Sequence, residues 1–107
     1  MNEEKIMSII EEVQKEREKQ IRMGFTADHD DEHSSGEISA WAAVYAMPPA
    51  CRKWDCICDY GSTLEEALMP DGRVLKSSDR RRELIKAAAL IVAEIERLDR
   101  ENERGEK

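Results

Sequence analysis

Two stretches of this chain, residues 3–23 and 79–102, repeat apolar residues every three or four positions. In the first stretch these residues are Ile6, Ile9, Ile10, Val13 and Ile21. In the second they are Leu84, Ala88, Ile91, Ile95 and Leu98, with spacings that alternate between four and three. Such a period puts the apolar side chains on one face of an α-helix, whereas no segment shows the alternation expected of a strand. We therefore predict an all-α fold with two long helices packed lengthwise.

A third helix is predicted to begin at Ser34 or Ser35. Ser34 and Glu37 have the spacing of a capping box, in which each side chain binds a backbone N–H at the helix start. The pair Pro48-Pro49 ends the segment. The expected apolar face consists of Ile38, Trp41, Ala42 and Tyr45. The fold is then a bundle of three main helices.

The connection over about residues 48–78 is predicted to be irregular, with one short helix at Thr63–Met69. A connection of this length in a small domain is commonly a lid, a binding loop or a partner surface. Trp54 lies within it and either covers the edge of the core or stacks on a ligand. The whole chain, 1–107, forms one helical domain, and the polar tail from about 101 to 107 is expected to fray.

Composition limits the partners. The formal net charge of −7 disfavours binding to nucleic acid and to anionic membranes. No apolar run has the length of a membrane span, and the acidic N-terminus does not resemble a signal peptide, so we expect a cytoplasmic protein. Cys51, Cys56 and Cys58 do not have the spacing of a common zinc site and are expected to be reduced thiols.

The stretch 24–37 contains both histidines of the chain among several carboxylates. Carboxylates and imidazoles bind divalent metals and carry out acid–base chemistry. The candidate ligands for Mg²⁺ or another divalent metal are His29, Asp30, Asp31 and His33. The candidate catalytic residues are Asp31, His33 and Glu37. His33 and Glu37 are one turn apart if the helix includes both. The alternative is an acidic loop that only caps and supports the neighbouring helices.

Three consecutive arginines, Arg80–Arg82, open the last helix. Positive charge is unfavourable at a helix N-terminus, so an anionic partner is expected. That partner is either the acidic run 28–32 or the phosphate of a ligand. An antiparallel return of the last helix would place Arg80 beside His29. The candidate ligand-binding residues are Arg80, Arg81, Arg82, Lys86, Gln20 and Trp54.

Several of these motifs together resemble a family of small phage and prophage proteins. The residues that carry the resemblance are Gly24-Phe25-Thr26, the run from His29 to His33, Gly36-Glu37-Ile38, and the closing segment from Arg80 to Arg100. The resemblance covers both ends of the chain and little of 48–78. It implies a phage or prophage protein that acts in the cytoplasm of a host cell.

A weaker similarity is to the MazG-like all-α nucleoside triphosphate pyrophosphohydrolases, which hold Mg²⁺ with paired carboxylates. Glu96-x-x-Asp99 fits one of their motifs, whereas the first two predicted helices contain no E-x-x-E motif. We therefore predict a non-enzymatic accessory protein that binds a nucleotide or another phosphate-containing ligand, or a host protein. The alternative is a metal-dependent pyrophosphohydrolase. Because the last helix is apolar on more than one side, we also predict a homo-oligomer.

Overall fold

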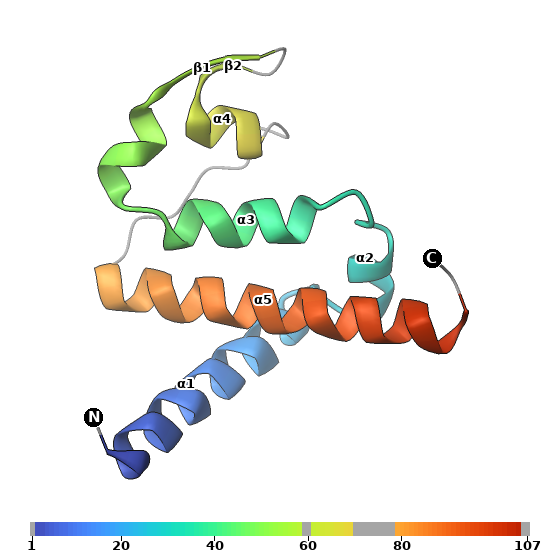
Figure 1. The fold of residues 1–107 in the computed structure, drawn as a ribbon. Coiled ribbons are helices and arrows are strands. Elements are labelled where there is room, and N and C mark those ends of the chain that lie inside the picture. Colours follow the sequence, from blue (N-terminus) through green and yellow to red (C-terminus); the bar gives the residue numbers. More distant parts are fainter. Residues whose placement is uncertain (1, 59–60, 70–78, 106–107) are drawn as a thin grey trace.

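The computed structural model describes residues 2–58, 61–69 and 79–105. Its helices are α1 (Glu3–Arg22), α2 (Ala27–Asp31), α3 (Glu37–Ala46), the 3₁₀ helix η1 (Pro49–Lys53), α4 (Leu64–Leu68) and α5 (Arg80–Glu103). Two short strands, β1 (Asp55–Cys58) and β2 (Gly61–Thr63), pair antiparallel. Figure 1 shows that helices dominate the fold, so the all-α prediction is confirmed.

The two long helices begin and end close to where the apolar period predicts. The Asn2 side chain caps α1 by accepting from the Lys5 N–H at 2.9 Å, and the Asp79 side chain caps α5 by accepting from the Arg82 N–H at 2.9 Å. At the other end α5 continues through Glu103, where we expected a frayed tail. Arg97 supports this last part because it donates to Glu101 at 3.4 Å, one turn further on.

The start of α3 differs from the prediction. The N-cap is Gly36, which has a φ of +90°, and no side chain caps the helix. Glu37 instead accepts from the Ser35 N–H at 2.7 Å, so the predicted capping box with Ser34 does not form. Before this turn lies α2, a short helix that we did not predict, capped by Thr26. The left-handed turn at Gly36 therefore separates His33 from the helix that contains Glu37.

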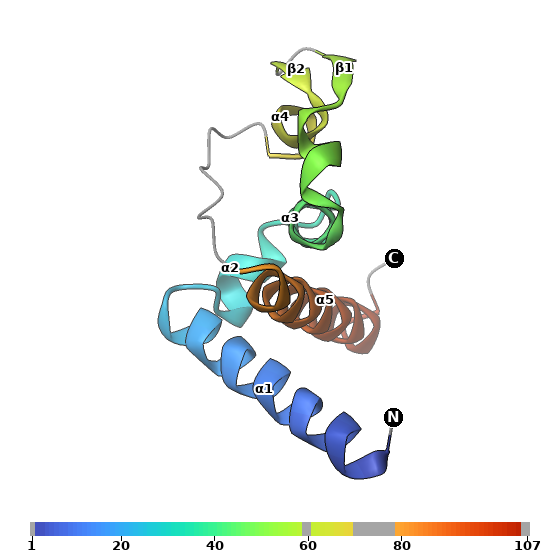
Figure 2. The same cartoon turned by 90° about the vertical axis from the view of Figure 1, so that its left-hand side faces the viewer.

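Helix α5 lies between α1 and α3. Ser39 donates to Glu94 at 3.4 Å and Arg80 donates to the Tyr45 carbonyl at 2.9 Å, so α3 runs antiparallel to α5. Figures 1 and 2 show that α1 crosses α5 obliquely and diverges from it toward the N-terminus. The prediction of lengthwise packing is wrong for this pair. The face of α1 that contacts α5 contains the buried polar residues Glu16, Arg17 and Gln20. These side chains bind groups of α5 at the crossing, so the two helices do not share a continuous apolar contact.

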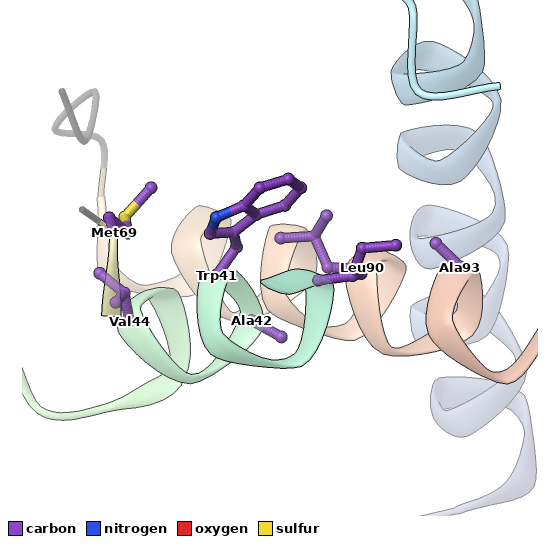
Figure 3. Close-up of a cluster of buried hydrophobic side chains, with 7 residues drawn as sticks. Trp41, Ala42, Val44, Met69, Leu90 and Ala93 are labelled. Atoms are coloured by element: carbon purple, nitrogen blue, oxygen red, sulfur yellow. The ribbon is translucent and has the colours of Figure 1, made fainter. Parts of the chain in front are cut away.

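The hydrophobic core lies between α3, α5 and the end of α4. Its buried members are Ile38, Trp41, Ala42, Val44, Met69, Leu90 and Ala93. Trp41 of α3 and Leu90 of α5 are among the residues drawn in Figure 3. Helix α5 contributes its alanine-rich face, because small side chains allow a neighbouring helix to approach closely. The predicted apolar contact face of α5 is largely exposed, and Ile95 is 53% exposed.

The segment after α3 forms a small layer made of η1, the β1–β2 pair and α4. The helix predicted at Thr63–Met69 is present as α4, with a capping box between Thr63 and Glu66. Among the cysteine side chains that the structure describes, Cys51 and Cys56 are free thiols. In the part of the chain that the structure describes, no helix combines the length and the apolar content needed to cross a membrane.

Candidate functional site

A pocket of about 300 Å³ opens where α1, α3 and α5 meet. Its polar wall comes from α1 and α5 and consists of Glu16, Lys19, Gln20 and Lys86. The opposite wall is aromatic and consists of Phe25, Trp41 and Tyr45. Met23, Met69 and Leu90 complete the lining. Sites for small molecules commonly combine apolar walls with a few converging polar groups, and this volume lies at the lower end of their range.

Gln20 is the most informative polar residue of the pocket. The residue is only 7% exposed, and its Nε2 donates to the Lys86 carbonyl at 3.5 Å. Its Oε1 is buried and accepts no hydrogen bond from any residue that the structure describes. A buried acceptor without a donor costs about 1–3 kcal/mol, so such groups are rare unless a ligand or a water satisfies them. The amide oxygen therefore offers a place for an N–H or O–H donor.

Charged groups surround the amide. Lys19 and Lys86 bring two ammonium groups to the same wall, and the Lys86 Nζ lies 5.8 Å from the centre of the Tyr45 ring. Glu16, which also lines the pocket, forms an ion pair with Arg82. Because this carboxylate already has a cationic partner, the two lysines leave the wall with positive charge available to an anion.

The aromatic wall is held in place by the predicted metal-binding segment. The Phe25 ring lies edge-on to Trp41, with 6.2 Å between centroids, and edge-on to His29, at 4.9 Å. His33 packs against His29 at 4.5 Å and against Trp41 at 5.2 Å. The two histidines thus form the back of an aromatic cluster whose front, Phe25 and Trp41, faces the pocket.

Hydrogen bonds fix both histidines. The His33 Nδ1 lies 2.8 Å from the His29 carbonyl, and because a carbonyl only accepts, Nδ1 must carry the proton. The His29 Nδ1 lies 3.1 Å from Asp30 Oδ1. Asp30 is 1% exposed, and its other oxygen accepts from Arg17 at 3.0 Å. Arg17 also donates to the Phe25 carbonyl and to Glu96, so it ties the start of the pocket's aromatic wall to α1 and α5.

Asp31 points away from this cluster, toward the end of α5. Arg100 donates to it at 2.9 Å and Arg104 at 3.4 Å. The hydrogen bond from Arg100 is the main reason that the pKa of Asp31 lies below its ordinary value, with Arg104 adding to the effect and desolvation opposing it. Asp30 therefore binds an arginine of α1 and Asp31 binds an arginine of α5. The two side chains point in different directions because each residue step along a helix turns the side chain by about 100°.

The four predicted metal ligands consequently do not share one site, because Asp31 points away from His29, Asp30 and His33. Asp30 is paired with Arg17 and Asp31 with Arg100, while His33 binds backbone. Among residues 2–58, 61–69 and 79–105, no group of three or more His, Cys, Asp or Glu side chains is arranged to hold a metal ion. The predicted catalytic set, Asp31, His33 and Glu37, is likewise dispersed, since Glu37 turns back to its own N-terminal loop.

The three arginines find hydrogen-bond acceptors, but not in the histidine segment. Arg80 donates to the carbonyls of Tyr45 and Ala46, where the C-terminus of α3 carries partial negative charge. Arg81 binds both oxygens of Glu12, at 2.6 and 2.8 Å, and Arg82 binds Glu16. The predicted meeting of Arg80 and His29 is wrong because α1 and α5 cross with the same chain direction, which brings the end of α5 to the histidines.

Of the predicted ligand-binding residues, only Gln20 and Lys86 line the pocket, and Arg82 reaches it through Glu16. Trp54 is 61% exposed and lies in the layer formed by η1, β1, β2 and α4. The predicted ligand-binding residues do not include Lys19, Phe25 or Met69, and Trp41 and Tyr45 are predicted to lie on the apolar face of α3. The stripe Glu12, Glu16 and Gln20, spaced by four, was the available signal for a polar face on α1.

Comparison with known proteins adds no relative: no protein-family model, no curated protein and no solved structure matches this chain.

Proposed function

We propose that the protein binds a small anionic ligand with a flat ring, most simply a nucleotide, in the pocket around Gln20. The observation that supports this most directly is the buried Gln20 Oε1, which has no donor among the described residues. Nucleobases carry N–H groups that suit such an acceptor, and recognition by a buried amide discriminates strongly against molecules that lack the donor.

The other walls suit the rest of a nucleotide. Phe25, Trp41 and Tyr45 offer aromatic surface for a base, and stacking on an aromatic side chain contributes about 1–3 kcal/mol per base. Lys19 is exposed and Lys86 is half-buried, so both ammonium groups can reach a phosphate at the rim. A nucleotide has all three features that these walls can bind, namely an N–H donor, a flat ring and an anionic phosphate.

The sequence resemblance supplies the setting of this proposal. A phage or prophage protein in the cytoplasm of its host would withdraw the bound nucleotide from use, without turnover. We propose that it does so as a homo-oligomer. A host protein as partner and a metal-dependent pyrophosphohydrolase are the two alternatives to this proposal.

Fluorescence titration tests the proposal. In a Trp54→Phe background, Trp41 is the remaining tryptophan and reports on the pocket wall. We expect a nucleotide to change its emission at concentrations where the matching nucleoside or inorganic phosphate alone does not. If no nucleotide of a panel of bases and phosphate lengths changes the emission or releases heat in calorimetry, the proposal fails. Pyrophosphate release with Mg²⁺ in the same panel would favour the hydrolase alternative.

Two variants locate the binding. Gln20→Met removes the amide with little change in volume, and we expect binding to weaken by about tenfold or more, from the loss of a buried hydrogen bond. The same change should leave the free energy of unfolding unchanged or raise it, because an unsatisfied buried acceptor is removed. Gln14→Met is the matched control, since Gln14 is an exposed residue of α1 outside the pocket. Equal affinity of both variants would place the ligand elsewhere.

A further inference from the structure

The side of the α1–α5 pair that faces away from the pocket is unusually apolar. We call it the apolar face, and it consists of Ile6, Met7 and Ile10 of α1 with Leu84, Ile91, Val92, Ile95 and Leu98 of α5. These side chains are between 38% and 53% exposed. At these fractions the eight residues together expose roughly several hundred Å², divided between two helices, and exposed apolar surface of this extent on a monomer commonly marks an interaction site. We infer that this face binds a second copy of the chain.

Helix geometry puts both halves of the apolar face on the same side of the molecule. Lys19 lines the pocket, and Ile10 precedes it by nine residues, which is about two and a half turns, so it lies on the opposite face of α1. Lys86 lines the pocket and Ile95 follows it by nine residues, so Ile95 lies on the opposite face of α5. Since the pocket lies between the two helices, Ile10 of α1 and Ile95 of α5 both lie on the side away from it. The pocket would stay accessible in a dimer.

On α5 the apolar residues have the spacing of a helix–helix interface. Leu84, Ala88, Ile91, Ile95 and Leu98 alternate spacings of four and three, the pattern that interlocks with a second helix along its length. Within the described chain, α3 uses the opposite face, with Leu90 and Ala93, and α1 crosses only once. The pattern is thus present for most of the length of α5 while the chain's own helices leave it exposed.

On α1 the apolar face continues an interface that already exists. Arg17 sits at the crossing and binds Glu96 of α5 at 2.8 Å. Ile10 and Ile6, seven and eleven residues earlier, lie near the same line along the helix. Figures 1 and 2 show this half of α1 diverging from α5, so the face runs from a covered part to an exposed one. A helix from another chain would extend the same contact.

A second copy fits this face better than a partner of a different kind. In a two-fold dimer the same residues of both copies form the interface. The apolar residues of α1 in each copy can then pack along α5 of the other copy. The result is a four-helix layer, which is a common way to bury such stripes. Specific interfaces bury about 800 Å² per partner, a size that eight large, half-exposed side chains and their surroundings can supply.

Sedimentation of the full chain tests the inference. We expect a dimer of two 12.3 kDa chains at micromolar concentration. Because each copy carries a net charge of −7, added salt should screen their repulsion and strengthen association. Ile95→Glu and Ile10→Glu should each give a monomer, with helix content unchanged by circular dichroism, because both positions are exposed in the single chain. Ile95→Ser serves as a milder change at the same position.

Trp54→Glu is the control, since Trp54 is a large exposed residue away from the apolar face and its substitution should leave the dimer intact. A wild-type monomer at high micromolar concentration would overturn the inference and leave the face to a different partner. A dimer that persists in both glutamate variants would also overturn it, because the contact would then lie elsewhere. Neither result depends on whether the pocket binds a nucleotide.

Discussion

Arg17 and Asp30 form a buried ion pair, with 3.0 Å between Arg17 Nη2 and Asp30 Oδ2. The Arg17 residue is 7% exposed and Asp30 is 1% exposed. The pair joins α1 to α2 and, through the Phe25 carbonyl, fixes the loop between them. The ion pair therefore helps to hold Phe25, a residue of the aromatic wall, in position beside the pocket.

Removal of one partner of this pair should be strongly destabilising. We expect Asp30→Ala to lower the free energy of unfolding by about 3–5 kcal/mol, because it leaves the Arg17 guanidinium buried with fewer partners. Urea denaturation measures the change. The double variant Asp30→Ala with Arg17→Met should lose less than the sum of the two single changes. Strict additivity would contradict a direct interaction between these residues.

The arginines at the start of α5 should differ in their effect on stability. Arg80→Ala should cost about 1 kcal/mol, because the carbonyls of Tyr45 and Ala46 lose a donor at the end of α3. Arg81→Ala should change the free energy of unfolding little, because its pair with Glu12 is largely exposed to solvent. Thermal denaturation of the two variants side by side measures both. A larger loss for Arg81→Ala would contradict these partner assignments.

Glu83 should make stability depend on pH in the acid range. The hydrogen bond from Arg52, assisted by Arg80, lowers the pKa of Glu83 below its ordinary value of 4.5 against the opposing effect of desolvation. The unfolded chain therefore binds this proton first as the pH falls. The contribution of Glu83 is present above about pH 4.5 and is lost as the pH falls through the folded pKa.

The measurement is the melting temperature of the wild type and of Glu83→Gln between pH 7 and pH 3. We expect the variant to be less stable at neutral pH and the gap to close toward acid pH. Glu11→Gln, at an exposed position of α1, should follow the wild type. A gap that stays constant with pH would contradict the proposed role of the Glu83 carboxylate.

Substitution of Gly36 should destabilise the protein because of its backbone conformation and not because of crowding of a new side chain. Its φ is +90°, yet a Cβ at this position would have no atom within 4 Å among the described residues. We expect Gly36→Ala to cost about 1–2 kcal/mol, the strain of a left-handed residue with a side chain. Gly36→Asn should cost less, because asparagine tolerates this conformation better. If alanine and asparagine cost the same in chemical denaturation, strain is not the cause.

Most helix positions in this protein follow from local sequence. Asn2, Asp79 and Thr63 each cap a helix through a contact three residues along, and the apolar period of 3–23 and 79–102 spans the two long helices. The start of α3 was missed because Ser34 and Glu37 match a capping box in spacing, while the left-handed turn at Gly36 changes their geometry. Gln20 and Lys86 were predicted as ligand-binding residues, but for a site shared with the arginines and the histidines.

The sequence by itself determined where α1, α4 and α5 form, because caps and apolar periods act over three or four residues. Only the tertiary structure decided which acid of another helix an arginine binds and which face each helix buries. Arg82 could have paired with Glu16 or with Asp30 on chemical grounds alone, and the direction in which α1 crosses α5 selects Glu16. The same crossing turns Gln20 and Lys86 toward Trp41, which makes the pocket a product of contacts between residues far apart in the chain.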